Sequence, residues 1–100
     1  MSIEIHTRYI HERCIPIPVA YVDGGLGLRL IGEDGEPVAT LTVRVPGLDE
    51  NEVAIKNYSE NEGLLDVAID AGWVDPPHRT VAVGYVDVPV CKIKAWPDGF

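Results

Sequence analysis

The sequence predicts an α+β domain: an antiparallel β-sheet of about five or six strands with one α-helix, at about residues 60–71, packed on one face. Two observations carry this prediction. Short stretches of alternating apolar and polar side chains recur between Pro, Gly and Asp-Gly turns, which is typical of strands. A single stretch has apolar residues at helical spacing. Because 100 residues make about one domain, we expect residues 1–100 to share a single core.

The first third of the chain predicts three strand segments. Residues 3–9 alternate between apolar and polar side chains, as a half-buried strand does. The alternation continues over residues 14–22, but two prolines there cannot donate ladder hydrogen bonds, so this segment is expected at a sheet edge. Residues 23–25 predict a turn, and residues 26–32, with leucine at every second position up to 30, predict the next strand.

The Asp34-Gly35 pair predicts a hairpin. Glycine supplies the positive φ of a tight turn, and the following residues 38–45 are rich in β-branched side chains, which favour a strand. Pro46-Gly47 should end that strand. We then expect an acidic loop over residues 48–52 and a short strand over residues 53–55.

A capping box predicts where the helix begins. Its Ser59 hydroxyl would accept a hydrogen bond from the Glu62 amide, and the Glu62 side chain would accept one from the Ser59 amide. Apolar residues then recur at helical spacing from Leu64 onward, and Gly72 stands where a left-handed C-cap is expected. The helix should therefore end at about Ala71.

The last quarter of the chain predicts a return to strands. Residues 75–78 form a rigid turn with two prolines, residues 80–83 a short strand, and residues 85–95 a closing strand. Pro89 should interrupt this closing strand because proline lacks the amide hydrogen.

Composition and charge narrow the class of protein. Hydrophobic residues make up 46% of the chain and charged residues 24%, as in ordinary folded domains. The net charge of −8 disfavours direct binding to nucleic acid or to anionic membranes. The chain has no run of about 20 apolar residues, and its N-terminus lacks the pattern of a signal peptide. We therefore expect a cytoplasmic protein.

The sequence contains none of the common catalytic or metal-binding motifs. It therefore predicts a protein that is not an enzyme and has no cofactor or metal. Phosphate-binding glycine loops, a His-Glu-x-x-His pair and a nucleophile elbow are missing, and the histidines are isolated. A histidine and a glutamate in one strand do not complete a metal site. Cys14 and Cys91 are predicted to be small buried side chains, with a disulfide between them as the alternative.

The acidic residues are concentrated in the middle of the chain. Residues 33–75 contain eleven acidic and two basic side chains, a net charge of −9, while the remainder has a net charge of +1. Such asymmetry predicts a polarised surface that suits a cationic partner.

Within the predicted helix, Glu62, Asp66 and Asp70 follow one another at every fourth position. On one helix face they would form an acidic stripe with a step of about 6 Å. This step is near twice the ~3.4 Å rise per phosphate of one DNA strand, so the stripe would suit phosphate mimicry. The alternative is that Glu62 serves the cap and the helix dipole, while the two aspartates only solvate the outer face.

Aromatic residues flank the helix and end the chain. Tyr58 and Trp73 are candidate anchors of a protein interface, because Tyr and Trp dominate binding hot spots, although such residues more often cover a core. The apolar tail Trp96 to Phe100 must pack on the domain or await a partner. The residues expected to bind a partner share a position near the helix or acidic charge in the loop before it: Asp49, Glu50, Glu52, Tyr58, Glu62, Asp66, Asp70 and Trp73.

Three segments carry a family resemblance. Residues 34–43, 56–64 and 88–91, which read DGEPVATLTV, KNYSENEGL and VPVC, look like a family of small bacterial proteins of unknown function encoded by phages, plasmids and conjugative elements. The resemblance covers roughly residues 26–95 and brings no catalytic residues. Small acidic proteins of such elements often inhibit host defence, as anti-CRISPR and anti-restriction proteins do, and this is what the resemblance implies.

Together, the charge asymmetry and the resemblance predict a non-catalytic inhibitor that binds a basic, nucleic-acid-handling surface. The partner that the resemblance implies is a defence effector such as a Cas complex. The alternative is a small-molecule-binding or regulatory module with a pocket between helix and sheet. An enzyme is the least favoured class.

Overall fold

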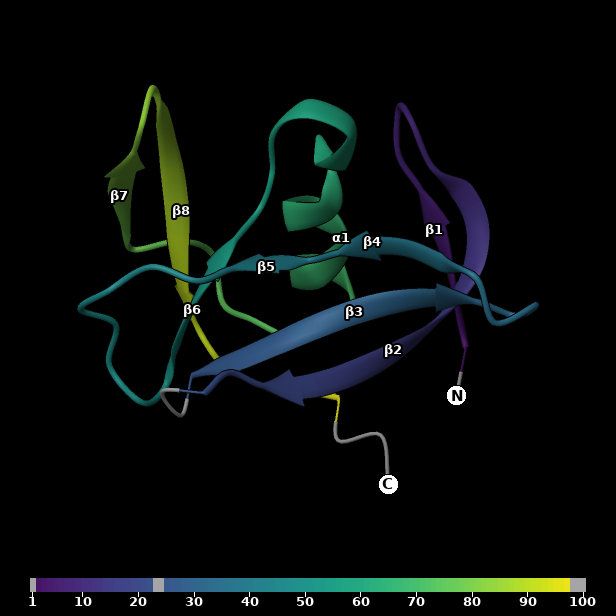
Figure 1. Cartoon of the computed structure of the whole chain (residues 1–100), viewed down its shortest axis with the longest axis horizontal. Coiled ribbons are helices and arrows are strands. Elements are labelled where there is room, and N and C mark those ends of the chain that lie inside the picture. Colours follow the sequence, from purple (N-terminus) through teal and green to yellow (C-terminus); the bar gives the residue numbers. More distant parts are fainter. Residues whose placement is uncertain (1, 23–24, 98–100) are drawn as a thin grey trace.

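The computed structural model describes residues 2–22 and 25–97, and these form two four-stranded antiparallel sheets and one α-helix (Figure 1). The predicted α+β class, with antiparallel strands and a single helix, is confirmed for this part of the chain. Within residues 2–22 and 25–97 the strands number eight and form two sheets, whereas the sequence predicted five or six strands in one sheet.

The first sheet has the strand order β1-β2-β3-β4, and each pair is antiparallel. β1 pairs only with the first part of β2, up to Cys14, so Pro16 and Pro18 lie where β2 has a neighbour on one side alone. The expected edge position of these prolines is confirmed. The strands of this sheet are β1 (Ile3–His6), β2 (His11–Ala20), β3 (Leu26–Gly32) and β4 (Pro37–Thr40).

The hairpin between β3 and β4 is built as the sequence predicts. Gly35 has a φ of +90°, the Gly32 amide donates to the Glu36 carbonyl at 2.8 Å, and an Asp34 carboxylate oxygen accepts from the Glu36 amide at 3.0 Å. The predicted turn residues therefore set the register of this hairpin.

The predicted strand 38–45 is divided at Leu41, and this division makes two sheets out of one. The amide of Leu41 donates to the Leu28 carbonyl of β3, while its own carbonyl accepts from the Lys56 amide, both at 2.8 Å. The chain thus leaves the first sheet at β4 and enters the second as β5 (Thr42–Val43). A β-branched run predicts a strand but cannot tell which neighbours it will have.

The second sheet has the order β5-β6-β8-β7. β8 runs without a break through Pro89, contrary to the sequence prediction. β6 pairs with β8 only from Lys92 to Val90, so Pro89 has β7 as its one neighbour and its missing amide hydrogen interrupts no ladder. The remaining strands of this sheet are β6 (Glu52–Ile55), β7 (Arg79–Val83) and β8 (Val86–Lys92).

The predicted capping box is wrong. Ser59, with a φ of +54°, begins a single 3-10 turn (Ser59–Asn61), and Glu62 donates its amide to the backbone carbonyl of Ser59 at 3.1 Å. The α-helix, α1 (Leu64–Asp70), starts only after Gly63, whose φ is +99°. Because this left-handed residue turns the chain, Glu62 lies outside the helix.

The side chain of Asn57 caps α1 instead. Its Oδ1 accepts hydrogen bonds from the amides of Gly63 and Leu65, both at 3.0 Å. Two of the amides that the first turn of a helix leaves unpaired are thereby satisfied.

Replacing Asn57 by alanine is therefore expected to lower the free energy of unfolding by about 0.5–2 kcal/mol, the usual cost of losing a cap. Urea denaturation followed by circular dichroism measures it. The control is Asn51→Ala, whose exposed side chain makes no hydrogen bond among the described residues. Equal losses in the two variants would contradict a capping role for Asn57.

The end of α1 follows the sequence prediction. Gly72 has a φ of +77°, the Trp73 amide donates to the Ala68 carbonyl, and the Gly72 amide donates to the Ile69 carbonyl, each at 3.0 Å. These are the paired bonds of a Schellman motif, with glycine at its left-handed position. The chain then turns Trp73 into the interior, where it is 4% exposed.

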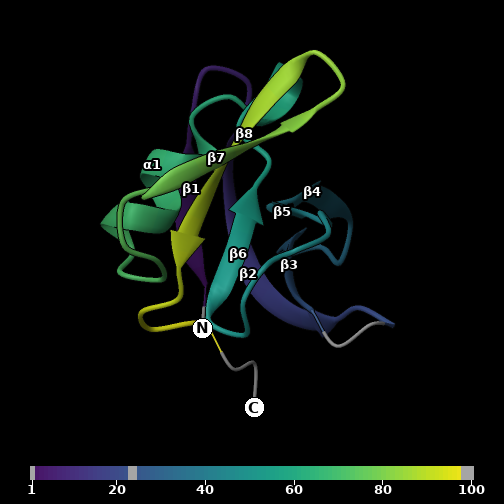
Figure 2. The same cartoon turned by 90° about the vertical axis from the view of Figure 1, so that its left-hand side faces the viewer.

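The main core lies between the first sheet, α1 and one face of the second sheet. Figure 2 shows α1 on one side of the molecule and β3 and β4 on the opposite side. Cys14 and Cys91 are both fully buried in it as free thiols, so the predicted burial is confirmed and the disulfide alternative is not. Burial raises the pKa of Cys91 to about 11, which keeps this thiol protonated. Trp96 packs against the same core, whereas residues 98–100 of the tail lie outside the described residues.

No helix of the described part is long and apolar enough to cross a membrane.

Candidate functional site

The structure separates the residues that were expected to bind a partner. Glu52 and Trp73 are buried, at 6% and 4% exposure, and Tyr58 is half-buried. The two interior side chains therefore cannot contribute to an outer surface in this fold. Five carboxylates remain exposed, those of Asp49, Glu50, Glu62, Asp66 and Asp70.

The acidic stripe on the helix is reduced to a pair. Asp66 and Asp70 lie four residues apart on the solvent side of α1. Glu62 precedes the helix, and its carboxylate lies 3.8 Å from the Arg8 guanidinium. Among the described residues, no cation lies within 4 Å of either aspartate. No described cation therefore offsets the like-charge repulsion of this pair, which costs an isolated helix about 0.2–0.5 kcal/mol. Asp66 itself lies in the first turn, where the helix dipole favours an acidic side chain.

The two acidic groups of the predicted surface belong to different elements. Asp49 and Glu50 belong to the segment between β5 and β6, whereas Asp66 and Asp70 belong to α1. Figure 2 shows α1 on one side of β6 and β8, and β5 on the other. The helix pair and the loop pair are therefore separate groups of carboxylates in the fold.

Tyr9 is an exposed aromatic residue near the start of the helix that sequence reasoning did not single out. Its side chain is 55% exposed, and the Arg8 guanidinium lies 5.5 Å from its ring centroid. Because Arg8 also lies 3.8 Å from the carboxylate of Glu62, the turn between β1 and β2 lies beside the segment that precedes α1. Only the tertiary contact reveals this placement, because the alternation of residues 3–9 predicts that Tyr9 is part of a strand.

Glu52 is the centre of a buried charge network. Its carboxylate accepts two hydrogen bonds from Arg79, at 2.8 and 3.1 Å, and one from the Asp49 amide at 2.9 Å. His78 Nε2 forms a further hydrogen bond with the same carboxylate. The sequence placed Glu52 in an exposed acidic loop, but the structure places it at the start of β6, where it ties the segment after β5 to β7.

This network sets the charge state of Glu52. The Arg79 guanidinium, followed by the Asp49 amide and His78, lowers the pKa of Glu52 from 4.5 to about 2. The same carboxylate raises the pKa of Arg79. Glu52 is consequently ionised at neutral pH, and the group acts as a structural clamp.

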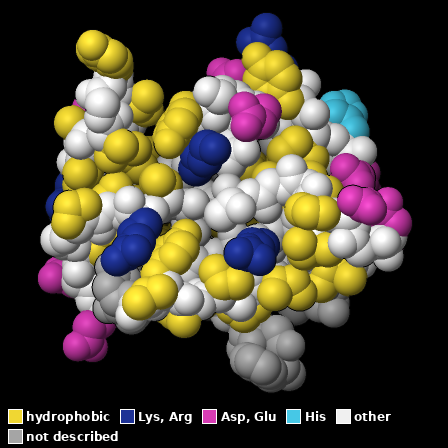
Figure 3. Space-filling view, viewed as in Figure 1, with side chains coloured by type: hydrophobic (Ala, Val, Ile, Leu, Met, Phe, Trp, Pro, Cys, Tyr) yellow, Lys and Arg dark blue, Asp and Glu magenta, His cyan; other side chains and the backbone are white. Residues whose placement is uncertain are grey.

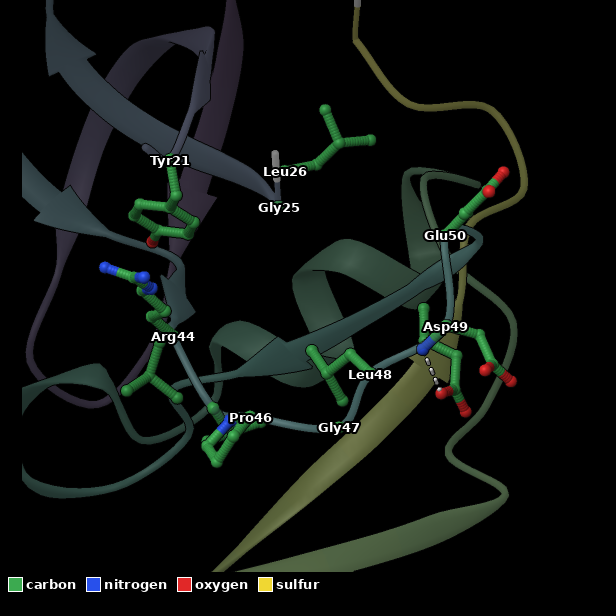
Figure 4. A pocket seen from close by; sticks show the side chains of 12 residues that line it. Tyr21, Gly25, Leu26, Arg44, Pro46, Gly47, Leu48, Asp49 and Glu50 are labelled. Carbon is green, nitrogen blue, oxygen red and sulfur yellow. Dashed lines mark hydrogen bonds between the residues drawn. The ribbon is translucent and has the colours of Figure 1, made fainter. Parts of the chain in front are cut away.

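A pocket of about 220 Å³ lies beside this clamp (Figure 4). Tyr21 and Arg44 line one side, Asp49 and Glu50 the other, and Leu48 lies between them. Neither the helix nor the core between helix and sheet contributes to it. Its volume is below the roughly 300–1,000 Å³ of typical small-molecule sites, so its size does not favour the small-molecule alternative.

The outer face of the first sheet is apolar and carries basic side chains. Because directly opposed residues share a face in an antiparallel pair, this face holds Ile17, which is 38% exposed, together with Arg29 of β3. Figure 3 looks at the molecule from this side and shows Lys and Arg side chains among apolar ones, with Asp and Glu mostly toward the edges. The register pairs on it are Ile15 with Ile31, Ile17 with Arg29, and Val19 with Gly27.

Two histidines that the sequence leaves apart are neighbours in the structure. His6 of β1 and His11 of β2 are a cross-strand pair, and their ring centroids lie 4.1 Å apart. The short turn between β1 and β2 produces this pairing, whereas the apolar–polar alternation predicts a first strand that runs on to residue 9 and past this turn.

A comparison with protein-family models, with curated proteins and with solved structures finds no match to this chain.

Proposed function

We propose that this chain is a non-catalytic binding protein that presents Asp66 and Asp70 to a basic surface of a protein partner. The uncompensated carboxylate pair on the solvent side of α1 carries this proposal. Two like charges four residues apart lower the stability of a helix. Local features that lower stability in this way are expected at functional surfaces. Complementary charge would speed association, and the exposed ring of Tyr9 adds an apolar contact near the start of the helix.

The resemblance extends the proposal to a class of partner. A protein of a mobile element gains from blocking a nucleic-acid-handling defence complex, and a Cas effector is the partner that fits best. Successive carboxylates on α1 are spaced by about 6 Å along the helix axis. They would occupy positions that such a complex offers to phosphate groups, and the basic surface would then no longer bind DNA or RNA.

The test uses tagged protein as bait in a bacterial lysate that contains a Cas effector, with quantitative mass spectrometry of the captured proteins. The charge-reversed variant is Asp66→Lys with Asp70→Lys. Its control is Glu33→Lys with Asp87→Lys, which changes the total charge equally at exposed positions outside α1. We expect the wild-type and control baits to capture nucleic-acid-binding subunits, and the helix variant to capture at least tenfold less.

Salt and fold controls complete this test. Capture should fall as salt rises, because exposed charges are screened over about 8 Å at physiological ionic strength. Asp66→Asn with Asp70→Asn should leave the fold intact and raise the free energy of unfolding by up to about 0.5 kcal/mol. Equal capture by the helix variant and its control, or capture that does not depend on salt, would refute the proposal.

A further inference from the structure

The turn between β1 and β2 brings two metal-binding side chains together on the surface. His6 and His11 are the last register pair of these strands before the turn. The Thr7 amide donates to the Ile10 carbonyl at 2.8 Å, so Thr7 and Ile10 form a hydrogen-bonded pair beside the turn. Because the two kinds of pair alternate along an antiparallel ladder, the adjacent pair, His6 with His11, is non-hydrogen-bonded. Opposed side chains are closest at such positions. Both imidazoles are exposed to solvent.

The two rings are close enough to bind one metal ion after their side chains turn. Nitrogen ligands bind Zn²⁺ at about 2.0–2.1 Å, so two nitrogens of a tetrahedral site lie about 3.3 Å apart. With both rings on one such ion, their centroids would lie about 5 Å apart. The observed rings, with centroids at 4.1 Å and planes inclined at 48°, must therefore turn apart by about 1 Å, and both side chains are exposed and have room to do so. Imidazole is a ligand of Zn²⁺, Ni²⁺ and Cu²⁺, whereas Mg²⁺ and Ca²⁺ take oxygen ligands.

The side chains around the two histidines determine how many coordination positions of a metal ion the protein can fill. Glu4, Glu12 and Arg13 border the same surface hollow, and Arg13 lies 3.7 Å from the Glu4 carboxylate. In residues 2–22 and 25–97, no group of three potential ligands is close enough to hold a metal ion together. An ion bound here therefore has two protein ligands and keeps its other positions open to water.

We propose that His6 and His11 form a two-histidine site for a divalent transition metal at the edge of the first sheet. The ion would link β1 to β2 and present open coordination positions to solvent. The proposal is independent of the proposed function, because it involves neither α1 nor its carboxylates.

Titration of the full chain with Zn²⁺ at pH 7.5, followed by the imidazole resonances in NMR spectra, tests the site. The resonances of His6 and His11 should shift together with one midpoint, at one Zn²⁺ per chain. His78 is the internal control, because its ring is hydrogen-bonded to Glu52. The His78 resonances should not move at this midpoint.

Two variants separate a paired site from single-histidine binding. His6→Gln and His11→Gln should each raise the half-saturating Zn²⁺ concentration at least tenfold, and thermal unfolding without metal should show that both variants are folded. At a Zn²⁺ concentration that saturates the wild-type chain, the melting temperature of the wild type should rise, and that of either variant should rise less. Retention of the wild-type midpoint by either variant, a shift of only one ring, or one Zn²⁺ per two chains would overturn the proposal.

Discussion

Replacing Leu41 by alanine is expected to lower the free energy of unfolding by about 2–5 kcal/mol, the usual cost of a large-to-small change in a core. Leu41 is fully buried in the main core, at the residue where the chain passes from the first sheet to the second. A cavity at this point would weaken the packing of both sheets. Domains of this kind are stable by only ~5–15 kcal/mol, so the loss is a large fraction of the total.

Urea denaturation followed by circular dichroism measures this effect, with Leu26→Ala as its control. Leu26 is 39% exposed at the start of β3, and its truncation should cost less than about 1 kcal/mol. If the two variants lose similar stability, Leu41 is not a packing centre of this fold.

Replacing Glu52 by glutamine is expected to destabilise the protein at pH 7 and to have a much smaller effect near pH 2. The native pKa of Glu52 is lowered from 4.5 to about 2, so its ionised form stabilises the fold fully above about pH 4.5. This contribution is lost as the pH falls from about 4.5 toward 2, because protonation removes the negative charge that Arg79 and His78 face.

Thermal unfolding at pH 7, 4 and 2.5 tests this dependence, with Glu50→Gln as the control. Glu50 is two residues away and exposed, and it takes no part in the network. The melting temperature of the Glu52 variant should approach that of the wild type as the pH falls, while the control should follow the wild type throughout. A difference that stays constant with pH would mean that the clamp does not depend on the charge of Glu52.

The features that the sequence predicted correctly depend on residues close together in the chain. The Asp34-Gly35 turn, the C-cap at Gly72 and the edge position of Pro16 and Pro18 each follow from the backbone preferences of one or two residues. Such preferences act in any tertiary context that can accommodate them. The α+β class followed for the same reason, from the periods of apolar side chains.

The capping prediction was wrong because two side chains near the helix start, Ser59 and Asn57, could each cap the helix, and the structure uses Asn57. Ser59 and Glu62 have the spacing of a capping box, but Gly63 adopts a left-handed conformation between them and the helix. Asn57, six residues before Gly63, then reaches the free amides. Cap energies differ by about 1 kcal/mol or less among these residue types, so packing decides which one is used.

By itself, the sequence determined the fold class, most of the strand and turn positions, and an acidic middle segment on which Asp66 and Asp70 remain exposed. Only the tertiary structure decided that Leu41 divides one predicted strand between two sheets, that Glu52 is buried against Arg79, and that His6 faces His11. Each of these depends on strand register or on a contact between distant segments. A local sequence pattern carries no information about which distant segment will lie beside it. Burial and strand pairing depend on both segments together.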